Sequence, residues 1–123
     1  MSQASQISTQ GIHHVSINVK DVDAAIEFYV GVLNLELLTR PDLGFPGAWI
    51  QAGGQEIHLL GIDSGTPVKE QHFALAVDDA DEVHATLTLQ GIAPSDVREI
   101  PNVCRQFFTH DPSGNMIEFN QRL

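Results

Sequence analysis

Two segments of the chain alternate hydrophobic and polar residues with a period of two, and both begin with a histidine. Segments 14–19 and 72–77 place His14 and His72 on the polar side. Because successive side chains of a strand point to opposite sides of a sheet, each segment is predicted to be a strand with one buried face. The apolar sides carry Val15, Ile17, Val19, Phe73, Leu75 and Val77.

Two later segments show the same alternation and form a second matched pair. Sliding the sequence by 58 residues lays HVSINVKDVDAA over HFALAVDDADEV, and sliding it by 60 lays EIHLL over MIEFN, so that His58 matches Glu118. A period of this length indicates one supersecondary unit used twice. Two units related by a pseudo-two-fold axis would bring together four potential metal ligands, which are His14, His58, His72 and Glu118.

The remaining elements complete both repeats as strand, helix and three strands, an α+β pattern. A helix is predicted after Asp21, a good N-cap, and a second from Asp79 to a stop at Gly91. The first helix has one apolar stripe at helical spacing, made of Val22, Ala25, Ile26, Tyr29 and Leu33. Further strands are expected near 35–39, 47–52, 55–60, 96–100, 104–110 and 115–120, with turns at 53–54 and 111–114.

Composition indicates one domain without a nucleic-acid or membrane partner. The 123 residues carry 42% hydrophobic residues and a net charge of -10, whereas nucleic-acid binding needs clustered Lys and Arg. A lone Cys104 permits no internal disulfide, and no long apolar run or signal peptide is evident, so a cytoplasmic location is expected. We expect a disordered leader over 1–10 and one domain over 11–123, with module one about 11–63 and module two about 68–121.

Three stretches make the chain resemble a known family. GIHHVSINVKDVDAAIEFYVGVLNLEL, QHFALAVDD and FFTHDPSGNMIEF are similar to sequences of the vicinal oxygen chelate superfamily, which includes glyoxalase I, fosfomycin-resistance enzymes, extradiol dioxygenases and bleomycin-resistance proteins. The resemblance covers nearly all of residues 11–121. It implies two βαβββ modules that form curled mixed sheets around a metal cleft, and a homodimer, in some relatives with the site built across the subunit boundary.

The resemblance also implies a ligand set. His14, His72 and Glu118 match its ligand positions, and His58 matches a position that binds metal in glyoxalase I but not in every member. Imidazole and carboxylate groups suit one divalent transition metal such as Fe, Ni, Zn, Co or Mn. Glu118 is the candidate base, because the matching Glu has this role in glyoxalase I, and His58 could be a ligand, a base beside the metal or a substrate contact. The competing interpretation of each His is a hydrogen-bonded surface residue.

Several residues are candidates for binding a small organic substrate. Loop 40–49 carries Phe45 and Trp49, which could wall the cleft or merely cover the end of the sheet. Arg40 and Arg105 could each bind a substrate carboxylate or pair with an Asp or Glu of this acidic chain. Phe107 and its neighbour Phe108 should point to opposite faces, so one of them, taken here as Phe107, meets the cavity.

Three functions remain open at this point. The first is a metal-dependent lyase or isomerase of glyoxalase type, which chelates vicinal substrate oxygens and stabilises an enediolate-type anion. The customary Arg of glutathione-linked glyoxalase I is missing near Ala24, Ala25 and Glu27, so another thiol adduct or dicarbonyl-derived substrate stays open. The second is a non-heme Fe(II) ring-cleaving dioxygenase, because two His and one carboxylate form its facial triad. The third is a non-catalytic drug-binding protein of the bleomycin-resistance type, which would not need the ligand set.

Overall fold

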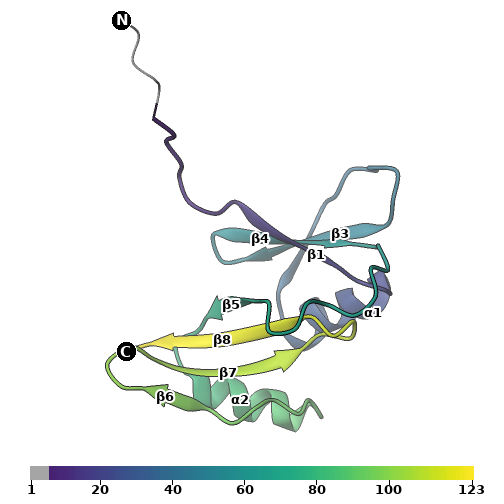
Figure 1. Cartoon of the computed structure of the whole chain (residues 1–123). Coiled ribbons are helices and arrows are strands. Elements are labelled where there is room, and N and C mark those ends of the chain that lie inside the picture. Colours follow the sequence, from purple (N-terminus) through teal and green to yellow (C-terminus); the bar gives the residue numbers. More distant parts are fainter. Residues whose placement is uncertain (1–5) are drawn as a thin grey trace, which may run out of the picture.

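The chain forms two modules with the same order of elements, as the repeat predicts (Figure 1). The computed structural model describes residues 6–123. Module one contains β1 (His14–Asn18), α1 (Val22–Ile26), η1 (Glu27–Val32), β2 (Glu36–Leu38), β3 (Gly47–Ala52) and β4 (Gln55–Leu60). Module two contains β5 (His72–Ala76), α2 (Ala80–Leu89), β6 (Arg98–Ile100), β7 (Cys104–His110) and β8 (Met116–Arg122).

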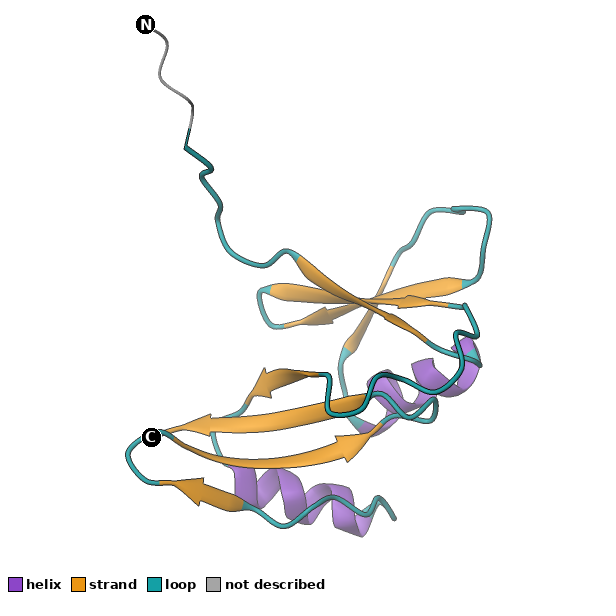
Figure 2. Ribbon diagram, in the orientation of Figure 1, coloured by secondary structure: helices purple, strands orange, loops and turns teal. Residues whose placement is uncertain are grey.

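Each module builds its own four-stranded mixed sheet, and the two sheets have equivalent topology. The strand orders are β1-β4-β3-β2 and β5-β8-β7-β6. The first strand of each module runs parallel to the last, because the helix carries the chain back across the sheet, and the other neighbours are antiparallel. Each helix lies along one face of the sheet of its own module (Figure 2). The α+β fold with paired βαβββ modules is therefore confirmed.

Capping explains where the helices begin. The Asp21 side chain accepts a hydrogen bond from the Ala24 amide at 3.0 Å, and the Asp79 side chain accepts one from the Glu82 amide at 3.1 Å. These contacts satisfy amides that lack a partner in the first turn of a helix. Gly91, with φ of 83°, follows the end of α2 in the left-handed conformation that favours glycine.

The first helix differs from the regular α-helix that its apolar stripe predicts. After Ile26 it widens into a π-helix, in which the Leu33 amide donates to the Phe28 carbonyl five residues earlier at 2.9 Å. The wider turn rotates the following side chains relative to a 3.6-residue period. Phe28 and Tyr29, although consecutive in the sequence, are both buried, and they meet edge to face at 5.2 Å between ring centroids.

The core lies between each helix and the face of the sheet that it covers. In module one, Ile50, Ile57 and Leu59 are buried, as the alternating pattern requires. In module two, Phe107, Ile117 and Phe119 have the same role. The hydrophobic face of every long strand is therefore used by the helix, which leaves the other face for polar side chains.

A buried polar contact joins the two modules. The Tyr29 hydroxyl donates to Asp111 Oδ2 at 2.8 Å, and both residues are at most 4% exposed. The Asn115 side-chain amide also donates to the Asn18 carbonyl at 2.9 Å, at the end of β1. The Lys20 amide donates to the Ser113 hydroxyl at 2.8 Å. The turn between β7 and β8 is thus attached to both β1 and η1.

Element boundaries follow the predictions closely, with differences at the ends. The strands expected at 35–39 and 96–100 are shorter, at Glu36–Leu38 and Arg98–Ile100, and β8 extends to Arg122. Of the expected leader, residues 1–5 lie outside the described part of the chain, and residues 6–10 form no helix or strand. Among residues 6–123, no helix is long and apolar enough to span a membrane.

Candidate metal centre

The first half-site consists of His14 and His58, on the face of the first sheet away from the helix. Strand β1 pairs in parallel with β4, and this register sets the His14 ring almost parallel to the His58 ring, with centroids 3.9 Å apart. Trp49 lies directly opposite His58 on β3 and stacks on its other side at 4.7 Å. His58, which is 9% exposed, is therefore held between two rings.

Burial and neighbouring groups influence the protonation of His14 in the first half-site. Nε2 of His58 lies 2.9 Å from Glu56 Oε1, and Nδ1 of His14 lies 2.8 Å from Nδ1 of His13. His13 precedes β1, so strand alternation does not set its direction, and its ring meets that of His14 edge to face with centroids 5.1 Å apart. Desolvation, followed by the charges of His58 and His13, lowers the pKa of His14. The neutral, metal-binding form of His14 is therefore favoured.

The second half-site consists of His72 and Glu118, on adjacent strands β5 and β8. His72 Nδ1 lies 2.8 Å from the Glu70 carbonyl, which can only accept a hydrogen bond, so this nitrogen carries the proton. In the neutral ring, Nε2 then presents a lone pair, and it lies 3.1 Å from Glu118 Oε1. The other carboxylate oxygen, Oε2, accepts a hydrogen bond of 2.7 Å from the Asn120 side chain.

The contact between His72 and Glu118 has the geometry expected of two ligands of one ion. An unprotonated imidazole nitrogen and a carboxylate oxygen both accept, so their approach to 3.1 Å calls for a cation or a shared proton between them. Ligand atoms at about 2.0–2.2 Å from one ion lie about 3 Å from each other in an octahedral site and about 3.3–3.6 Å in a tetrahedral one. Glu118 is only 8% exposed, which would strengthen its attraction for a cation.

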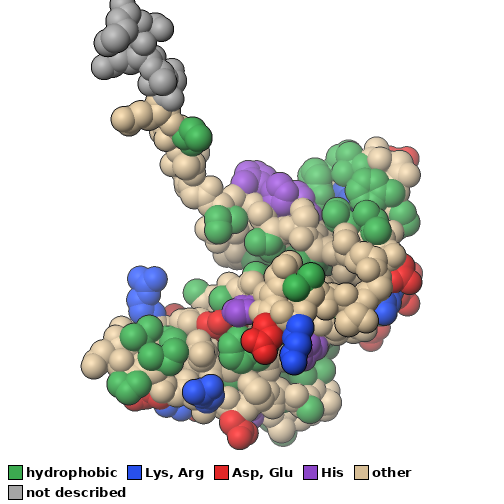
Figure 3. Space-filling model, viewed as in Figure 1, with side chains coloured by type: hydrophobic (Ala, Val, Ile, Leu, Met, Phe, Trp, Pro, Cys, Tyr) green, Lys and Arg blue, Asp and Glu red, His purple; other side chains and the backbone are tan. Residues whose placement is uncertain are grey.

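The two half-sites do not combine into one group of metal ligands within the described part of the chain. Over residues 6–123, no three His, Cys, Asp or Glu side chains lie close enough together to hold a metal ion. Histidine side chains are found at separated places over the two sheets (Figure 3). The repeat therefore brings the four candidates together as two pairs, and not as one group of four.

Three candidate substrate contacts belong to module one, and the structure relates two of them to each other. The guanidinium of Arg40 lies 4.9 Å above the Phe45 ring, and its Nη2 donates to the Phe45 carbonyl at 3.1 Å. Arg40 thereby fixes the loop that carries Phe45, and Phe45 itself is 37% exposed. Trp49 faces the first half-site through its stack on His58. An aromatic side chain thus lies beside His58.

Arg105 and Phe107 lie on the helix side of the second sheet. Arg105 is bound by Asp81 at 2.8 and 3.0 Å and by Glu99 at 3.0 Å, which is the acidic pairing considered as its alternative. Hydrogen bonding to Arg105 lowers the pKa of Asp81. Phe107 is fully buried and stacks on Phe119 at 4.9 Å between centroids.

The aromatic residue that meets the second half-site is Phe108, which corrects the choice of Phe107. The Phe108 ring approaches His72 edge to face at 5.3 Å. Strand β7 alternates regularly, so the phenylalanine opposite Glu118 faces the half-site and its neighbour enters the core. Sequence reasoning missed Asn120 as a partner of Glu118, although its position two residues later on the same strand was a usable signal.

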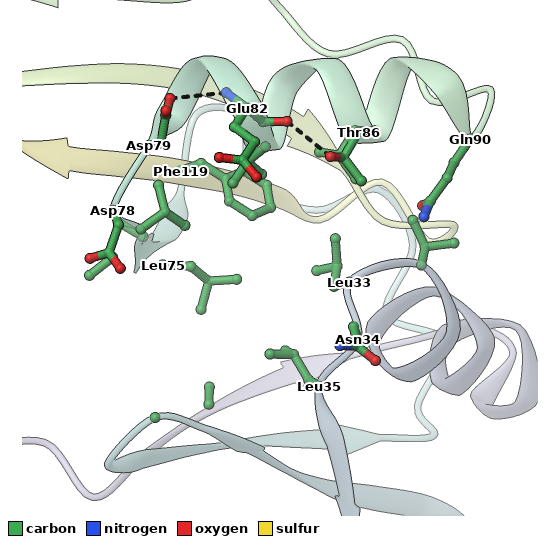
Figure 4. A pocket seen from close by; sticks show the side chains of 18 of the residues that line it. Leu33, Asn34, Leu35, Leu75, Asp78, Asp79, Glu82, Thr86, Gln90 and Phe119 are labelled. Carbon is green, nitrogen blue, oxygen red and sulfur yellow. Dashed lines mark hydrogen bonds between the residues drawn. The ribbon is translucent and has the colours of Figure 1, made fainter.

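A large cavity of about 1150 Å³ lies elsewhere, between the two modules on the side of α2 (Figure 4). Its walls include Leu33 and Leu35 from module one and Leu75 and Phe119 from module two. Glu82 projects toward it from α2. None of the four candidate ligands lines this cavity, so it lies outside the candidate metal centre.

Comparisons with known proteins find relatives in sequence and in fold. Glyoxylase I 4 of Arabidopsis thaliana is 33% identical over 118 residues, which cover 87% of this chain and 68% of that protein. A Vibrio cholerae protein named probable lactoylglutathione lyase is 30% identical, with 94% and 93% covered. The crystal structure of a glyoxalase family protein from Bacillus anthracis superposes with a TM-score of 0.87 at 31% identity, covering 97% of this chain and all of that one.

The sequence also matches a family model over nearly its whole folded part. The match extends over residues 11–119, which include both half-sites. The chain therefore belongs to the Glyoxalase/Bleomycin resistance protein/Dioxygenase superfamily.

Proposed function

We propose that this protein is a divalent-metal-dependent lyase or isomerase of glyoxalase type, acting on a small organic substrate that offers two vicinal oxygens. The observation that carries the proposal is the 3.1 Å approach of His72 Nε2 to Glu118 Oε1, which places an imidazole nitrogen and a carboxylate oxygen of adjacent strands where both could bind one ion. Relatives named glyoxylase and lactoylglutathione lyase support this branch of the superfamily.

A divalent transition metal fits the residues present. His72 and Glu118 would hold it from module two, and His14 from module one, with His58 as a further ligand or a base beside the metal. Neutral imidazoles with one carboxylate suit Fe, Ni, Zn, Co or Mn and leave positions open for substrate oxygens. The lowered pKa of His14 keeps its ring in the form that binds metal.

We further propose that the site is completed in a homodimer, with module one of one chain facing module two of the other. Each described module holds two of the four ligands, and no three of them meet in one chain. Both β1 and β5 are edge strands, each with one neighbour in its sheet. A two-fold arrangement would create two equivalent sites, each with both half-sites.

The residues around the centre have distinct tasks in this mechanism. When bound, the metal would supply Lewis acidity that stabilises a developing oxyanion on the substrate. Glu118 accepts a proton from the substrate carbon and returns it to the neighbouring carbon, while Asn120 orients the carboxylate through its 2.7 Å hydrogen bond. Trp49 and Phe108 provide apolar walls that limit water access.

One observation favours a second candidate, the non-heme Fe(II) dioxygenase. Nε2 of His58 is engaged by Glu56 at 2.9 Å, and this contact would leave His14, His72 and Glu118 as a facial triad of two imidazoles and one carboxylate. Oxygen consumption with catechols by the iron-loaded protein would support this candidate. Loss of a methylglyoxal hemithioacetal signal without oxygen uptake would support the lyase.

Mixing two inactive variants tests both the metal centre and its assembly. A His14→Ala chain keeps an intact module two, and a Glu118→Ala chain keeps an intact module one. If sites form between chains, unfolding and refolding the two variants together should regenerate one intact site in each heterodimer, or about a quarter of the wild-type metal content and hemithioacetal turnover. Each variant refolded alone is the control.

The outcomes separate the parts of the proposal. Full metal content in either variant alone would remove that residue from the ligand set. Wild-type protein that binds no Ni, Zn, Fe, Co or Mn at all would contradict the metal-dependent function. Metal binding by the wild type without recovery in the mixture would contradict the shared site, provided that circular dichroism shows both variants to be folded.

A further inference from the structure

The face of the second sheet that carries Glu118 also carries two arginines. Across strands β6, β7 and β8 the register places Arg98 opposite Gln106, and Gln106 opposite Asn120. One row further along, Cys104 lies opposite Arg122. Directly paired residues of antiparallel strands point to the same side, so Arg98 and Arg122 share the side of Asn120 and Glu118.

Side-chain contacts confirm this common face. The Asn120 amide donates to Glu118 Oε2 at 2.7 Å, and the Cys104 thiol donates to Gln106 Oε1 at 3.7 Å. Phe108, which lies opposite Glu118, meets the ring of His72. The face is therefore ordered from an aromatic and metal-ligand end at His72 to a polar and cationic end at Arg122.

These two arginines differ from Arg105 in having no acidic partner. Arg105 points to the helix side and is held by Asp81 and Glu99. Over the described residues 6–123, no carboxylate is within ion-pair distance of Arg98 or Arg122, although the chain has 16 acidic residues and 6 basic ones. Two exposed guanidinium groups on one face of so acidic a protein make a local site for an anion.

We propose that Arg98 and Arg122 bind a carboxylate group of the substrate, so that the substrate is a small organic acid with its vicinal oxygens at one end and its carboxylate at the other. This inference rests on the proposed metal centre, because Glu118 and His72 define the end where the vicinal oxygens bind. It also assigns the task of binding an anion to residues other than Arg40 and Arg105, which the structure ties to protein groups.

Strand geometry sets the approximate length of that substrate. Arg122 follows Glu118 by four residues, or about 13 Å along the strand at about 3.3 Å per residue. Arg98 is two strands from β8, or about 10 Å across the sheet, in the row of Asn120. Arginine side chains are long enough to close much of either gap. A chain of a few carbon atoms between the chelating oxygens and the carboxylate therefore fits.

Two hydroxamates that differ only at their far end provide the test. Glutaric acid monohydroxamate and pentanohydroxamic acid both chelate a divalent metal through vicinal oxygens, and only the first carries a carboxylate. Their affinities for the Ni-loaded and Zn-loaded full-length protein would be measured by calorimetry. We expect the carboxylate to tighten binding by about tenfold, the scale of one charge-assisted interaction.

Variants locate the origin of that preference. Arg98→Gln and Arg122→Gln should each reduce the preference for the glutaric compound while the affinity for pentanohydroxamic acid stays within about twofold. Lys20→Gln removes the same charge at a distant turn and should leave the preference unchanged. The double variant Arg98→Gln/Arg122→Gln should bind both compounds about equally.

The possible outcomes separately test the carboxylate preference, its assignment to the two arginines and the metal centre. Equal affinity of wild-type protein for both hydroxamates would overturn the inference and leave the metal centre intact. A preference that survives in the double arginine variant would overturn the assignment to these residues. No binding of either compound, in a protein that also fails to retain metal, would overturn the proposed function and this inference with it.

Discussion

The two half-sites come from repeated elements, yet they differ in chemistry. The first offers two imidazoles, and its carboxylate, Glu56, engages His58 at 2.9 Å. The second offers one imidazole and the carboxylate Glu118 in direct contact. Matched positions on the strands thus carry different residues in the two modules. The second half-site carries the anionic candidate ligand, and the first carries two imidazoles beside the ring of Trp49.

The largest expected effect is the loss of metal affinity when a candidate ligand is removed. His72→Ala should weaken Ni or Zn binding by at least about tenfold, because it removes a donor atom from the half-site that already has metal-like spacing. His58→Ala should have a smaller or metal-selective effect, because Glu56 engages its Nε2. Competition with a chromophoric chelator measures both affinities.

A matched histidine provides the control for this experiment. His84 lies on α2, on the helix side of the second sheet, where it meets Phe107 at 5.1 Å. His84→Ala should therefore leave metal affinity unchanged. Wild-type affinity in His72→Ala would remove the second half-site from the proposed centre.

Breaking the joint between the modules should have the next largest effect, on stability. Asp111→Ala removes the acceptor of Tyr29 and of the Ser113 and Asn115 amides, so it should lower the free energy of unfolding by about 3 kcal/mol. Tyr29→Phe removes one donor and should cost about 1 kcal/mol, because Asp111 keeps its other partners. Urea denaturation measures both values.

The order of these two effects tests how the modules are joined. If Tyr29→Phe were as destabilising as Asp111→Ala, the hydrogen bond of the Tyr29 hydroxyl would account for most of the free energy that this contact contributes, and the bonds within the turn for little. If neither variant changed stability, the contact would contribute nothing to holding the modules together.

The smallest expected effect is a change in the titration of the first half-site. His14 should titrate below the ordinary 6.5, because desolvation and the neighbouring His58 and His13 disfavour its charged form. Its folded pKa is depressed, so the associated stability is present above pH 6.5 and is lost as the pH falls through the folded value. In His13→Ala, the charge of His13 is removed, and the pKa of His14 should rise toward 6.5.

NMR of the imidazole protons in metal-free protein measures this titration directly. Lys69→Ala, in the linker between the modules, controls for a general change in charge. A pKa of His14 that did not move in His13→Ala would show that the contact of 2.8 Å between the two rings has no electrostatic effect.

Much of the fold was predictable because the repeat and the alternation are local signals. His14, His72 and Glu118 had to lie on the faces opposite Val15, Phe73 and Ile117, whatever the rest of the chain did. Asp21 and Asp79 marked helix starts because a side-chain oxygen caps the nearest amides. Phe107 was misassigned because alternation separates it from Phe108 without saying which of the two sides faces the helix.

Local patterns left other features undetermined. The π-turn of η1 depends on packing Phe28 and Tyr29 together into the core, which no helical stripe specifies. The contact of His13 with His14 depends on the path of the chain before β1. The pairing of Arg105 with Asp81 depends on α2 crossing β7. The sequence therefore did not indicate which acidic residue pairs with Arg105.

The sequence by itself determined two equivalent sheets, each with a polar face that carries two candidate ligands, because alternation and repetition act over a few residues at a time. Only the tertiary structure decided that these ligands meet in pairs within one chain, His14 with His58 and His72 with Glu118. The physical reason is that strand register brings together neighbours within one sheet, whereas the distance between the sheets is set by contacts such as Tyr29 with Asp111, far apart along the chain.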